Sequence, residues 1–214
     1  HTERGANILN RGDRQRHLIM IVSGWAARCR YTRAGSRQIQ HILLPGDVAT
    51  PDVFVIDRSD HDIQCLSDCQ YRLVEPAAMR ALFRHSEAVA SAMWWSAEQE
   101  DGILREHIVR LGRRAANERV PHLFLELHRR LVMVDQATED TFLLPLTQAD
   151  IADALGLSAV HVNRTLRNLS KDGFIDYAHG IVTVHDPVQL AEYCDFDISH
   201  LHLDSHIVEE RLDG

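Results

Sequence analysis

The chain has 214 residues, of which 45% are apolar and 25% are charged, as is usual for one or two globular domains. This composition excludes an intrinsically disordered chain, a collagen-like repeat and a miniprotein held together by disulfides. The net charge of −8 would oppose a nucleic-acid partner if it were spread evenly. However, residues 186–214 hold eight acidic residues against Arg211 alone, so this tail carries −7 of the −8.

The longest apolar runs, such as Leu18 to Val22, are far shorter than the roughly 18 residues that a membrane-spanning helix requires. We therefore expect no transmembrane segment and no membrane partner. The four cysteines follow no Cys-x-x-Cys spacing, and a chain of this length can bury a core without disulfides, so a reducing, cytoplasmic setting fits best. The chain opens at His1 rather than Met, which leaves open what precedes it, a removed signal peptide included.

From Ile8 to about Glu75, short apolar stretches alternate with turn signals such as Ser23-Gly24 and Pro45-Gly46-Asp47. Turns at intervals of about 10 to 12 residues favour an antiparallel sandwich or a small barrel. Its buried strands are predicted at Leu18–Val22 and Ile39–Leu44.

After Glu75 the turn residues become rare and the apolar spacing becomes helical. Pro76, at a first turn, opens a short helix through Phe83, and a longer helix runs from about Ser86 to Arg114. A further helix, Val120 to Val134, is marked by Pro121.

The long helix carries an apolar stripe with steps of 4, 7, 4 and 3 residues, in the a/d manner of helices that pack on one another. Its members are Met93, Ala97, Leu104, Ile108 and Leu111. The stripe could instead pack on the chain's own barrel. Because a helix of about 29 residues is longer than a small barrel, we favour a homodimer interface. Trp94 and Trp95 are adjacent, so only one can face it, and the other is expected to pack on the barrel.

Residues 135–146 are interpreted as a connector, after which Thr147 and Asp150 form a pattern close to a capping box and begin a helix. Gly156 can supply the left-handed residue that ends this helix, and Ser158 caps a second one after a turn of three residues. Two short helices at this spacing indicate a helix-turn-helix.

The second helix, from Ser158 to about Lys171, has two distinct faces. Val162, Leu166 and Leu169 point inward. The outer stripe consists of Val160, Asn163, Arg164, Arg167 and Lys171, and the helix contains no acidic residue. Because asparagine can pair with adenine and arginine with guanine, this face could contact bases in the major groove of DNA. The alternative is a solvated amphipathic helix of a protein that binds no DNA.

The residues that follow this helix favour DNA binding. Residues Gly173 to Tyr177, the turn His179-Gly180 and residues Ile181 to Val184 predict a two-stranded hairpin, the wing of a winged helix.

The stretch from Leu146 to Ile175, LTQADIADALGLSAVHVNRTLRNLSKDGFI, resembles the winged-helix motif of the Crp/Fnr family of bacterial transcription regulators nearly end to end. The order of the other elements is similar over roughly residues 5–185. The resemblance implies an α+β fold: an N-terminal antiparallel, jelly-roll-like β-roll, a long dimerisation helix and a C-terminal winged helix-turn-helix. It assigns residues 1–85 to a β-roll sensor domain, 86–114 to the dimerisation helix, 115–186 to the DNA-binding domain and 187–214 to an acidic tail.

Two departures from the family concern its effectors. Members that bind cyclic AMP carry Gly-Glu-Leu shortly after the Gly-Asp turn and an Arg-Ser pair further on, whereas no Gly-Glu follows Gly46-Asp47 here. Arg58-Ser59 could imitate the second element, but Asp57, Asp60 and Asp62 would oppose an anion. The family's oxygen sensors hold an iron–sulfur cluster with cysteines near the N-terminus, whereas Cys29, Cys65, Cys69 and Cys194 are scattered. These residues argue against both cyclic AMP and a cluster, and the effector is unknown.

The second helix of the helix-turn-helix differs from the family's pattern at Val160, where many relatives have a glutamate. Glutamate accepts a hydrogen bond from cytosine, whereas valine can only contact the methyl group of thymine. The operator should therefore differ from those of the relatives at that base pair. Arg164 matches the family's arginine, which implies a role in reading bases, and Thr147 and Gln148 align with the phosphate-contacting helix start. The predicted DNA-binding residues are Thr147, Gln148, Ser158, Val160, His161, Asn163, Arg164, Arg167 and Lys171.

Other chemistry has weaker support. Cys65 and Cys69 are interpreted as apolar fillers, with a redox pair as the alternative. No metal site is predicted, although the tail residues His200, His202, Asp204 and His206 could converge on zinc. The histidines of the first domain, namely His17, His41, His61 and His85, lack the His-x-His spacing with a following Glu of metal-dependent cupin enzymes. No nucleophile elbow, phosphate-binding glycine loop or His-Glu-x-x-His motif occurs, so no enzymatic activity is predicted.

The sequence therefore predicts a cytoplasmic, homodimeric transcription regulator. Its two recognition helices should enter successive major grooves about 34 Å apart on a near-palindromic site. RNA polymerase is a further candidate partner. The competing hypotheses are a sensor or protein-interaction module whose helix-turn-helix binds no DNA, and a metal-dependent β-roll enzyme.

Overall fold

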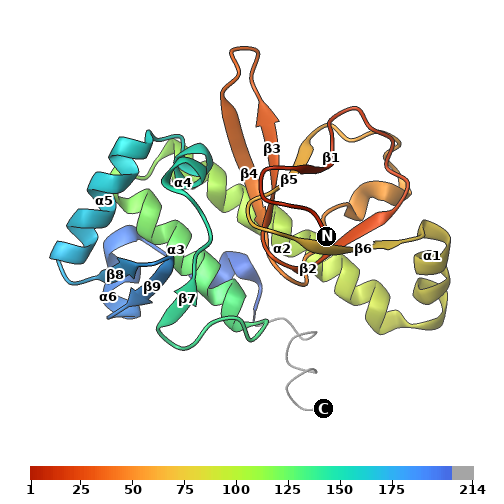
Figure 1. The fold of residues 1–214 in the computed structure, drawn as a ribbon. Coiled ribbons are helices and arrows are strands. Elements are labelled where there is room, and N and C mark those ends of the chain that lie inside the picture. Colours follow the sequence, from red (N-terminus) through yellow and green to blue (C-terminus); the bar gives the residue numbers. More distant parts are fainter. Residues whose placement is uncertain (204–214) are drawn as a thin grey trace. The chain divides into compact units, whose positions relative to one another are not determined.

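The computed structural model describes residues 1–203, which form two compact units (Figure 1). The first unit comprises residues 1–30 and 40–104 together with residues 199–203. The second comprises residues 31–39 and 105–198. The sequence predicts domain boundaries after residues 85 and 114, on either side of the long helix. In the structure, the boundary between the two units lies inside this helix, between residues 104 and 105.

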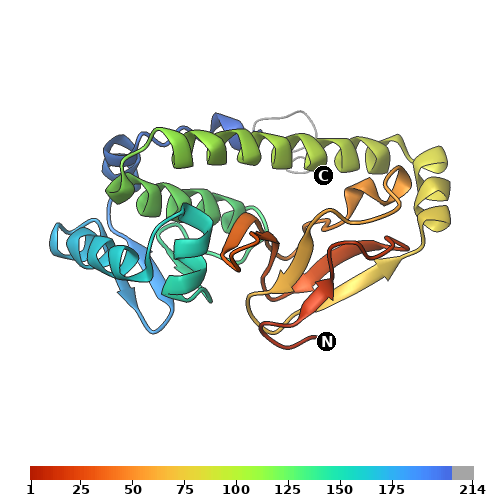
Figure 2. The ribbon, with the colours of Figure 1, turned by 90° about the horizontal axis from the view of Figure 1, so that it is seen from above.

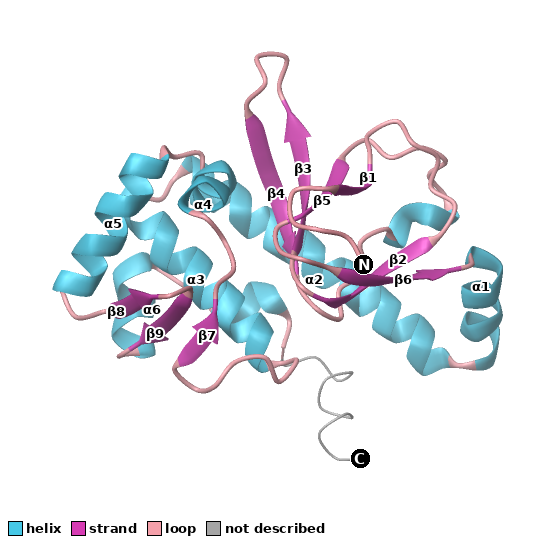
Figure 3. Ribbon diagram, in the orientation of Figure 1, coloured by secondary structure: helices cyan, strands magenta, loops and turns pink. Residues whose placement is uncertain are grey.

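The first unit contains the expected β-roll. Its strands are β1 (Asn7–Leu9), β2 (Leu18–Ser23), β3 (Ala26–Tyr31), β4 (Arg37–Leu43), β5 (Asp62–Cys65) and β6 (Gln70–Val74). Tyr31, the last residue of β3, and residues 37–39 of β4 belong to the second unit. One sheet has the order β1-β5-β3-β4, and β2 pairs antiparallel with β6 in the other (Figure 3). The predicted strands at Leu18–Val22 and Ile39–Leu44 are present as β2 and β4.

Apolar side chains from both sheets form the core of the β-roll. Ile21, Leu43 and Ile63 are each at most 1% exposed, and Cys65 and Cys69 are buried with them. Full burial of one such aliphatic side chain stabilises a fold by about 1.5–3 kcal/mol. Since none of the four cysteines forms a disulfide, the β-roll is held by this packing and not by covalent links.

Two helices follow the β-roll, α1 (Pro76–His85) and α2 (Glu87–Gly112). Ser86 separates them, and its hydroxyl accepts a hydrogen bond from the backbone N–H of Val89 at 3.3 Å. Figure 2 shows α2 as one unbroken helix. Inside the first unit, the buried Arg28 of β3 pairs with Glu100 of α2 and so joins the sheet to the helix. None of the helices in residues 1–203 combines the length and apolarity needed to span a bilayer.

The second unit is built around α3 (Ala116–Val132), which is buried continuously from Val120 to His128. The other elements are β7 (Thr141–Leu143), α4 (Gln148–Leu155), α5 (Ala159–Lys171), β8 (Ile175–Ala178), β9 (Ile181–Val184), α6 (Pro187–Cys194) and the 3-10 helix η2 (Ile198–Leu201). The three strands form one sheet in the order β7-β9-β8.

The second unit differs from the sequence prediction in three places. Helix α3 begins at Ala116 and not at Val120, because the side chain of Glu118 accepts a hydrogen bond from the backbone N–H of Ala115 at 2.8 Å and so caps an earlier turn. Strand β7 lies in the segment interpreted as a connector. Helix α6 occupies the start of the segment assigned to the acidic tail, where Asp186 caps it by accepting from the backbone N–H of Gln189 at 2.9 Å.

A buried network of charges lies between the end of α2 and α3. The guanidinium of Arg110 pairs with Glu126, and its Nε donates to Nδ1 of His122 at 3.1 Å. The other ring nitrogen of His122 lies 3.1 Å from Glu106, which also pairs with Arg114 at 2.6 Å. Because each buried charge has an opposite partner, the network fixes the last two turns of α2 to α3.

Candidate nucleic-acid interface

The predicted capping box at the start of α4 is present. The hydroxyl of Thr147 accepts a hydrogen bond from the backbone N–H of Asp150 at 3.1 Å, and the Asp150 carboxylate accepts from the backbone N–H of Thr147 at 2.9 Å. The Thr147 hydroxyl also donates to this carboxylate at 2.7 Å. Gly156 ends α4 in the left-handed region, with φ of 62°, as the sequence predicts. Both ends of α4 are therefore fixed by local contacts.

Helix α5 begins at Ser158, whose hydroxyl accepts from the backbone N–H of His161 at 3.2 Å. One face of the helix is buried in the second unit, through Val162, Thr165, Leu166 and Leu169. On the other face Val160 is 80% exposed, and Arg164, Arg167 and Lys171 are also exposed, while His161 and Asn163 are partly exposed. The predicted outer stripe is thus accessible to a ligand.

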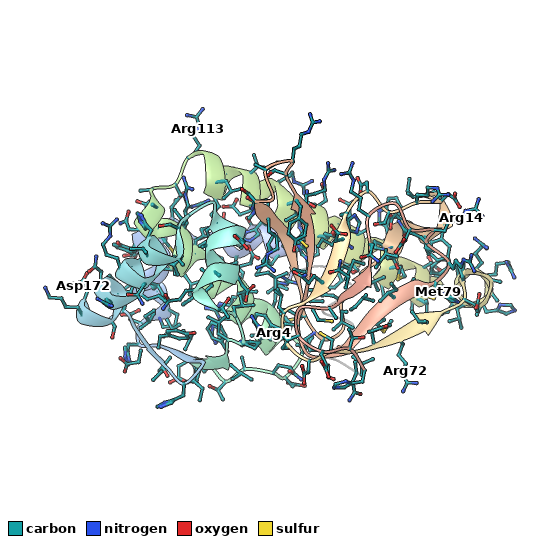
Figure 4. All side chains as sticks on the ribbon, turned by 45° about the horizontal axis from the view of Figure 1, so that its top comes forward. Arg4, Arg14, Arg72, Met79, Arg113 and Asp172 are labelled. Carbon is teal, nitrogen blue, oxygen red and sulfur yellow. The ribbon has the colours of Figure 1, made fainter. Side chains whose placement is uncertain are left out.

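The side chain of Arg164 is oriented by its own helix. Its Nη2 donates to Nδ1 of His161 at 3.2 Å, which requires that this ring nitrogen carry no proton. Asp172 follows α5 directly and is exposed at its outer end, where Figure 4 shows it projecting away from the ribbon.

The predicted wing is present as the hairpin of β8 and β9. Its two strands pair antiparallel from Ile175 opposite Val184 to Ala178 opposite Ile181. The turn residues His179 and Gly180 have φ of 53° and 77°, the signs that a two-residue type I′ turn requires. The wing is widened by β7, which pairs with β9.

A groove of about 540 Å³ lies where α4, α5 and β8 meet. Its lining residues are Gln148, Asn163, Leu166, Arg167, Ser170, Lys171 and Tyr177. Four of these belong to the predicted DNA-binding set, and the groove brings them together from two helices. The sequence does not predict Ser170 and Tyr177. A signal for Tyr177 was available, because alternation places it on the same side of β8 as the buried Ile175.

The predicted dimer stripe on α2 is only partly exposed. Ala97 is exposed, Ile108 is 70% exposed and Leu104 is partly buried. Met93 packs against the cluster of Leu18, Val48 and Met79 in its own β-roll. Leu111 contacts the turn of the helix-turn-helix, since a Cβ added at Gly156 would lie 3.7 Å from Leu111 Cδ2.

The two adjacent tryptophans of α2 have different environments. Trp94 is 72% exposed. Trp95 donates its indole N–H to the backbone carbonyl of His202 at 3.0 Å, a contact with the C-terminal segment, whereas the sequence predicts packing on the barrel. Gln99, one turn along, donates to the carbonyl of Leu201 at 2.8 Å. Leu201 and His202 therefore lie along this side of α2.

The residues that could imitate a cyclic-phosphate site bind the protein's own backbone. Arg58 donates to the carbonyl of Gly12 at 2.7 Å, and the Ser59 hydroxyl donates to the carbonyl of His61 at 2.7 Å. Both side chains therefore make contacts within the β-roll itself.

All four cysteines are buried, and none forms a disulfide. Burial and the neighbouring Cys69 raise the pKa of the Cys65 thiol to about 12, so Cys65 is protonated at neutral pH. Among residues 1–203, no three His, Cys, Asp or Glu side chains are placed to hold a metal ion. Asp204 and His206, which belong to the tail alternative, lie outside the described residues.

Comparison with known proteins covers both units. A model of the cyclic nucleotide-binding domain matches residues 1–86, and a model of the Crp-like helix-turn-helix domain matches residues 118–193. The nitrogen fixation regulation protein FixK of Azorhizobium caulinodans is 31% identical over 74% of this chain and 63% of its own length, so the chain matches less than two thirds of that relative. The FixK protein of Bradyrhizobium diazoefficiens is 29% identical over 89% of this chain and 79% of its own.

Solved structures agree with this assignment. The structure of FixK2 from Bradyrhizobium japonicum superposes with a TM-score of 0.79 at 25% identity and covers 89% of this chain and 93% of its own. A CRP-family transcriptional regulator from Thermus thermophilus has a TM-score of 0.67 at 19% identity, covering 91% and 95%, and supports the fold. Together with the exposed cationic face of α5, these matches show that the chain belongs to the Crp/Fnr family of DNA-binding transcription regulators.

Proposed function

We propose that this chain regulates transcription by binding double-stranded DNA as a homodimer, with α5 in the major groove. The observation that carries the proposal is the outer face of α5, which is exposed, cationic and free of carboxylates. Such a face can approach DNA without burying an unpaired negative charge. The proposed base contacts come from Asn163 and Arg164, with Val160 and His161 beside them.

The phosphate contacts surround this face. Arg167 and Lys171 supply charge from α5, and Gln148 supplies an amide from the start of α4. We add Tyr177 and Ser170, because they line the same groove. Thr147 and Ser158 use their hydroxyl oxygens to cap α4 and α5, so their part is to orient the backbone N–H groups at the helix starts.

The homodimer interface is proposed for the exposed side of α2. Of the predicted stripe, Ala97, Leu104 and Ile108 are available there, and Trp94 lies on the same side. Met93 and Leu111 contribute to packing within their own subunit and border the interface. Two copies would place two α5 helices about 34 Å apart on a near-palindromic operator.

We further propose that the β-roll receives the controlling signal, with an effector other than cyclic AMP, and that RNA polymerase is a partner of the bound dimer. The units correspond in role to the sensor and DNA-binding domains inferred from the sequence. Since the chromosome is the target of such a protein, the cytoplasm is its proposed location. No enzymatic activity is needed for this role.

The test is selection of duplexes from a random pool by the full chain, followed by fluorescence anisotropy with the selected and a random duplex. We expect the selected duplex to bind about a thousandfold or more tightly than the random one at physiological salt. Arg113→Ala is the matched control for α5 variants, because Arg113 is an exposed arginine that lies outside α5 (Figure 4). Failure to enrich any sequence, with no binding to random duplex at low salt, would refute the proposal and favour a protein-interaction module.

A further inference from the structure

Arg37 is the first residue of β4 and belongs, with the rest of residues 31–39, to the second unit. Its guanidinium contacts two carboxylates of α4. Nη2 lies 2.6 Å from Oδ1 of Asp150, and Nε lies 2.7 Å from Oδ2 of Asp153. The next residue, Gln38, donates its side-chain N–H to the carbonyl of Ala154 at 3.3 Å. The end of the β3–β4 hairpin is therefore bonded along the length of α4.

The ion pairs are largely shielded from water. The side chains of Arg37 and Asp150 are 16% and 6% exposed, and that of Asp153 is 33% exposed. Charge-assisted hydrogen bonds in such surroundings are stronger than those on an open surface. Asp150 and Asp153 are separated by one helical turn, a spacing that the planar, forked donors of arginine can bridge and the single ammonium of lysine cannot.

Asp150 also takes part in the capping box of α4, and this links Arg37 to the DNA-binding surface. While Oδ1 accepts from Arg37, Oδ2 accepts from the backbone N–H and the hydroxyl of Thr147. The same carboxylate thus fixes the first turn of α4, whose next residue Gln148 lines the groove between α4, α5 and β8. A change in the position of Arg37 must alter this turn.

Arg37 also affects the charge near the groove. Without it, α4 would present two carboxylates and no basic residue, since its sequence QADIADAL contains no Lys or Arg. Phosphates approaching Gln148 would then meet two uncompensated negative charges within about a Debye length.

We propose that Arg37 is a positioning residue for DNA binding, acting through Asp150 and Asp153 to set the start of α4 and to offset its negative charge. The inference rests on the proposed function and adds a residue from the N-terminal part of the chain to it. Arg37 touches no DNA in this scheme.

The test compares Arg37→Gln with Arg33→Gln in the full chain. Arg33 is the matched control, because it is an exposed arginine of the same hairpin turn and its replacement changes the net charge equally. We expect Arg37→Gln to weaken binding about five- to tenfold on selected and random duplexes alike, since phosphate contacts are lost without regard to sequence. Arg33→Gln should change binding less than about twofold.

Two further measurements separate positioning from a general loss of structure. Titration at high protein concentration gives the active fraction, which should equal that of the wild type. Asp153→Asn in the Arg37→Gln background should recover about half of the lost binding on the logarithmic scale, because it removes one of the two uncompensated charges. Amide hydrogen exchange at Thr147 and Asp150, whose backbone N–H groups are bonded within the capping box, should accelerate in Arg37→Gln while exchange in α5 stays the same.

Wild-type affinity of Arg37→Gln would overturn the inference while the proposed function stands. An equal loss in Arg33→Gln would show that only the charge of the hairpin matters, and would also overturn it. A double variant, Arg37→Gln with Asp153→Asn, that binds DNA no more tightly than Arg37→Gln would overturn it as well. If the wild type binds no duplex, the proposed function fails and the inference falls with it, even though hydrogen exchange would still report the contact with α4.

Discussion

Removal of the Glu126 carboxylate should destabilise the second unit far more than a surface substitution. Glu126 is 3% exposed and pairs with Arg110, which is 1% exposed. Breaking a buried ion pair by removing one partner costs about 3–5 kcal/mol, because the remaining charge is left uncompensated. In Glu126→Ala, Arg110 keeps Nδ1 of His122 as an acceptor at 3.1 Å, so we expect the lower limit, about 3 kcal/mol.

The placement of the tryptophans makes the assay specific. All three, at positions 25, 94 and 95, lie in the first unit, so their fluorescence reports that unit, while far-UV circular dichroism also follows the helices of the second. Urea unfolding of Glu126→Ala should shift the dichroism transition to lower urea and leave the fluorescence transition nearly in place. Glu98→Ala, which removes an exposed carboxylate from α2, is the matched control and should shift neither.

The double variant Arg110→Met with Glu126→Leu tests the physical reason. If the cost arises from an unpaired buried charge, removing Arg110 together with Glu126 should restore the part of the stability that was lost through Arg110, while Arg130, 3.9 Å from Glu126, still loses that contact. A loss below about 1 kcal/mol in Glu126→Ala, or a double variant no more stable than the single one, would refute the reasoning.

Three further predictions concern function, pH and assembly. Arg164→Ala should cost about 1–3 kcal/mol on the selected duplex and relax one base position, whereas Lys171→Ala should weaken all duplexes alike and reduce the salt slope by about one, both measured by anisotropy. Equal losses on selected and random duplex for Arg164→Ala would contradict its role. Burial and the nearby Arg110 lower the pKa of His107 to about 4 in the folded chain, below its value of about 6.5 in the unfolded one. The unfolded state therefore binds more protons between these values, so stability falls as pH drops, by about 2 kcal/mol from pH 7 to pH 5 in urea titrations, and His107→Gln should lack this part of the loss. Ile108→Asp, at a 70% exposed position, should leave the subunit folded but dissociate the dimer in sedimentation velocity, and a dimer of unchanged stability would place the interface elsewhere.

The helix-turn-helix could be predicted from the sequence because its determinants are local. Thr147 and Asp150 bond to each other across three residues, Gly156 supplies the left-handed end and Ser158 caps the next helix within one turn. Each of these interactions needs only the neighbouring residues, so the pattern specifies both helices and their faces.

The elements that the sequence does not predict depend on distant partners. Strand β7 is a three-residue strand that forms only because β9 pairs with it, some 40 positions later. Arg37 is separated from Asp150 by 113 positions, and no local signal distinguishes it from the other arginines of the hairpin.

The dimer stripe shows a limit of periodicity itself. A straight α-helix turns by about 100° per residue, so Met93 and Leu111, which are 18 residues apart, lie on one line after five full turns. Ile108 lies about 60° away from this line. Met93 and Leu111 contact their own subunit, whereas Ile108 is exposed, so the spacing alone does not show which edge of the stripe is buried.

The acidic composition of the chain does not oppose DNA binding, because carboxylates of the second unit are paired with basic side chains or lie outside the exposed face of α5. Asp150 and Asp153 are paired with Arg37, and Asp176 of the wing lies 3.1 Å from the ring of His185. Helix α5 has no carboxylate, and Asp172 lies beyond its last turn. At the ionic strength of a cell, fixed charges act over about 8 Å, so a phosphate at the groove responds mainly to the charges nearest to it. The net charge of a whole chain is therefore a poor guide to its partner when the charges are paired or segregated in this way.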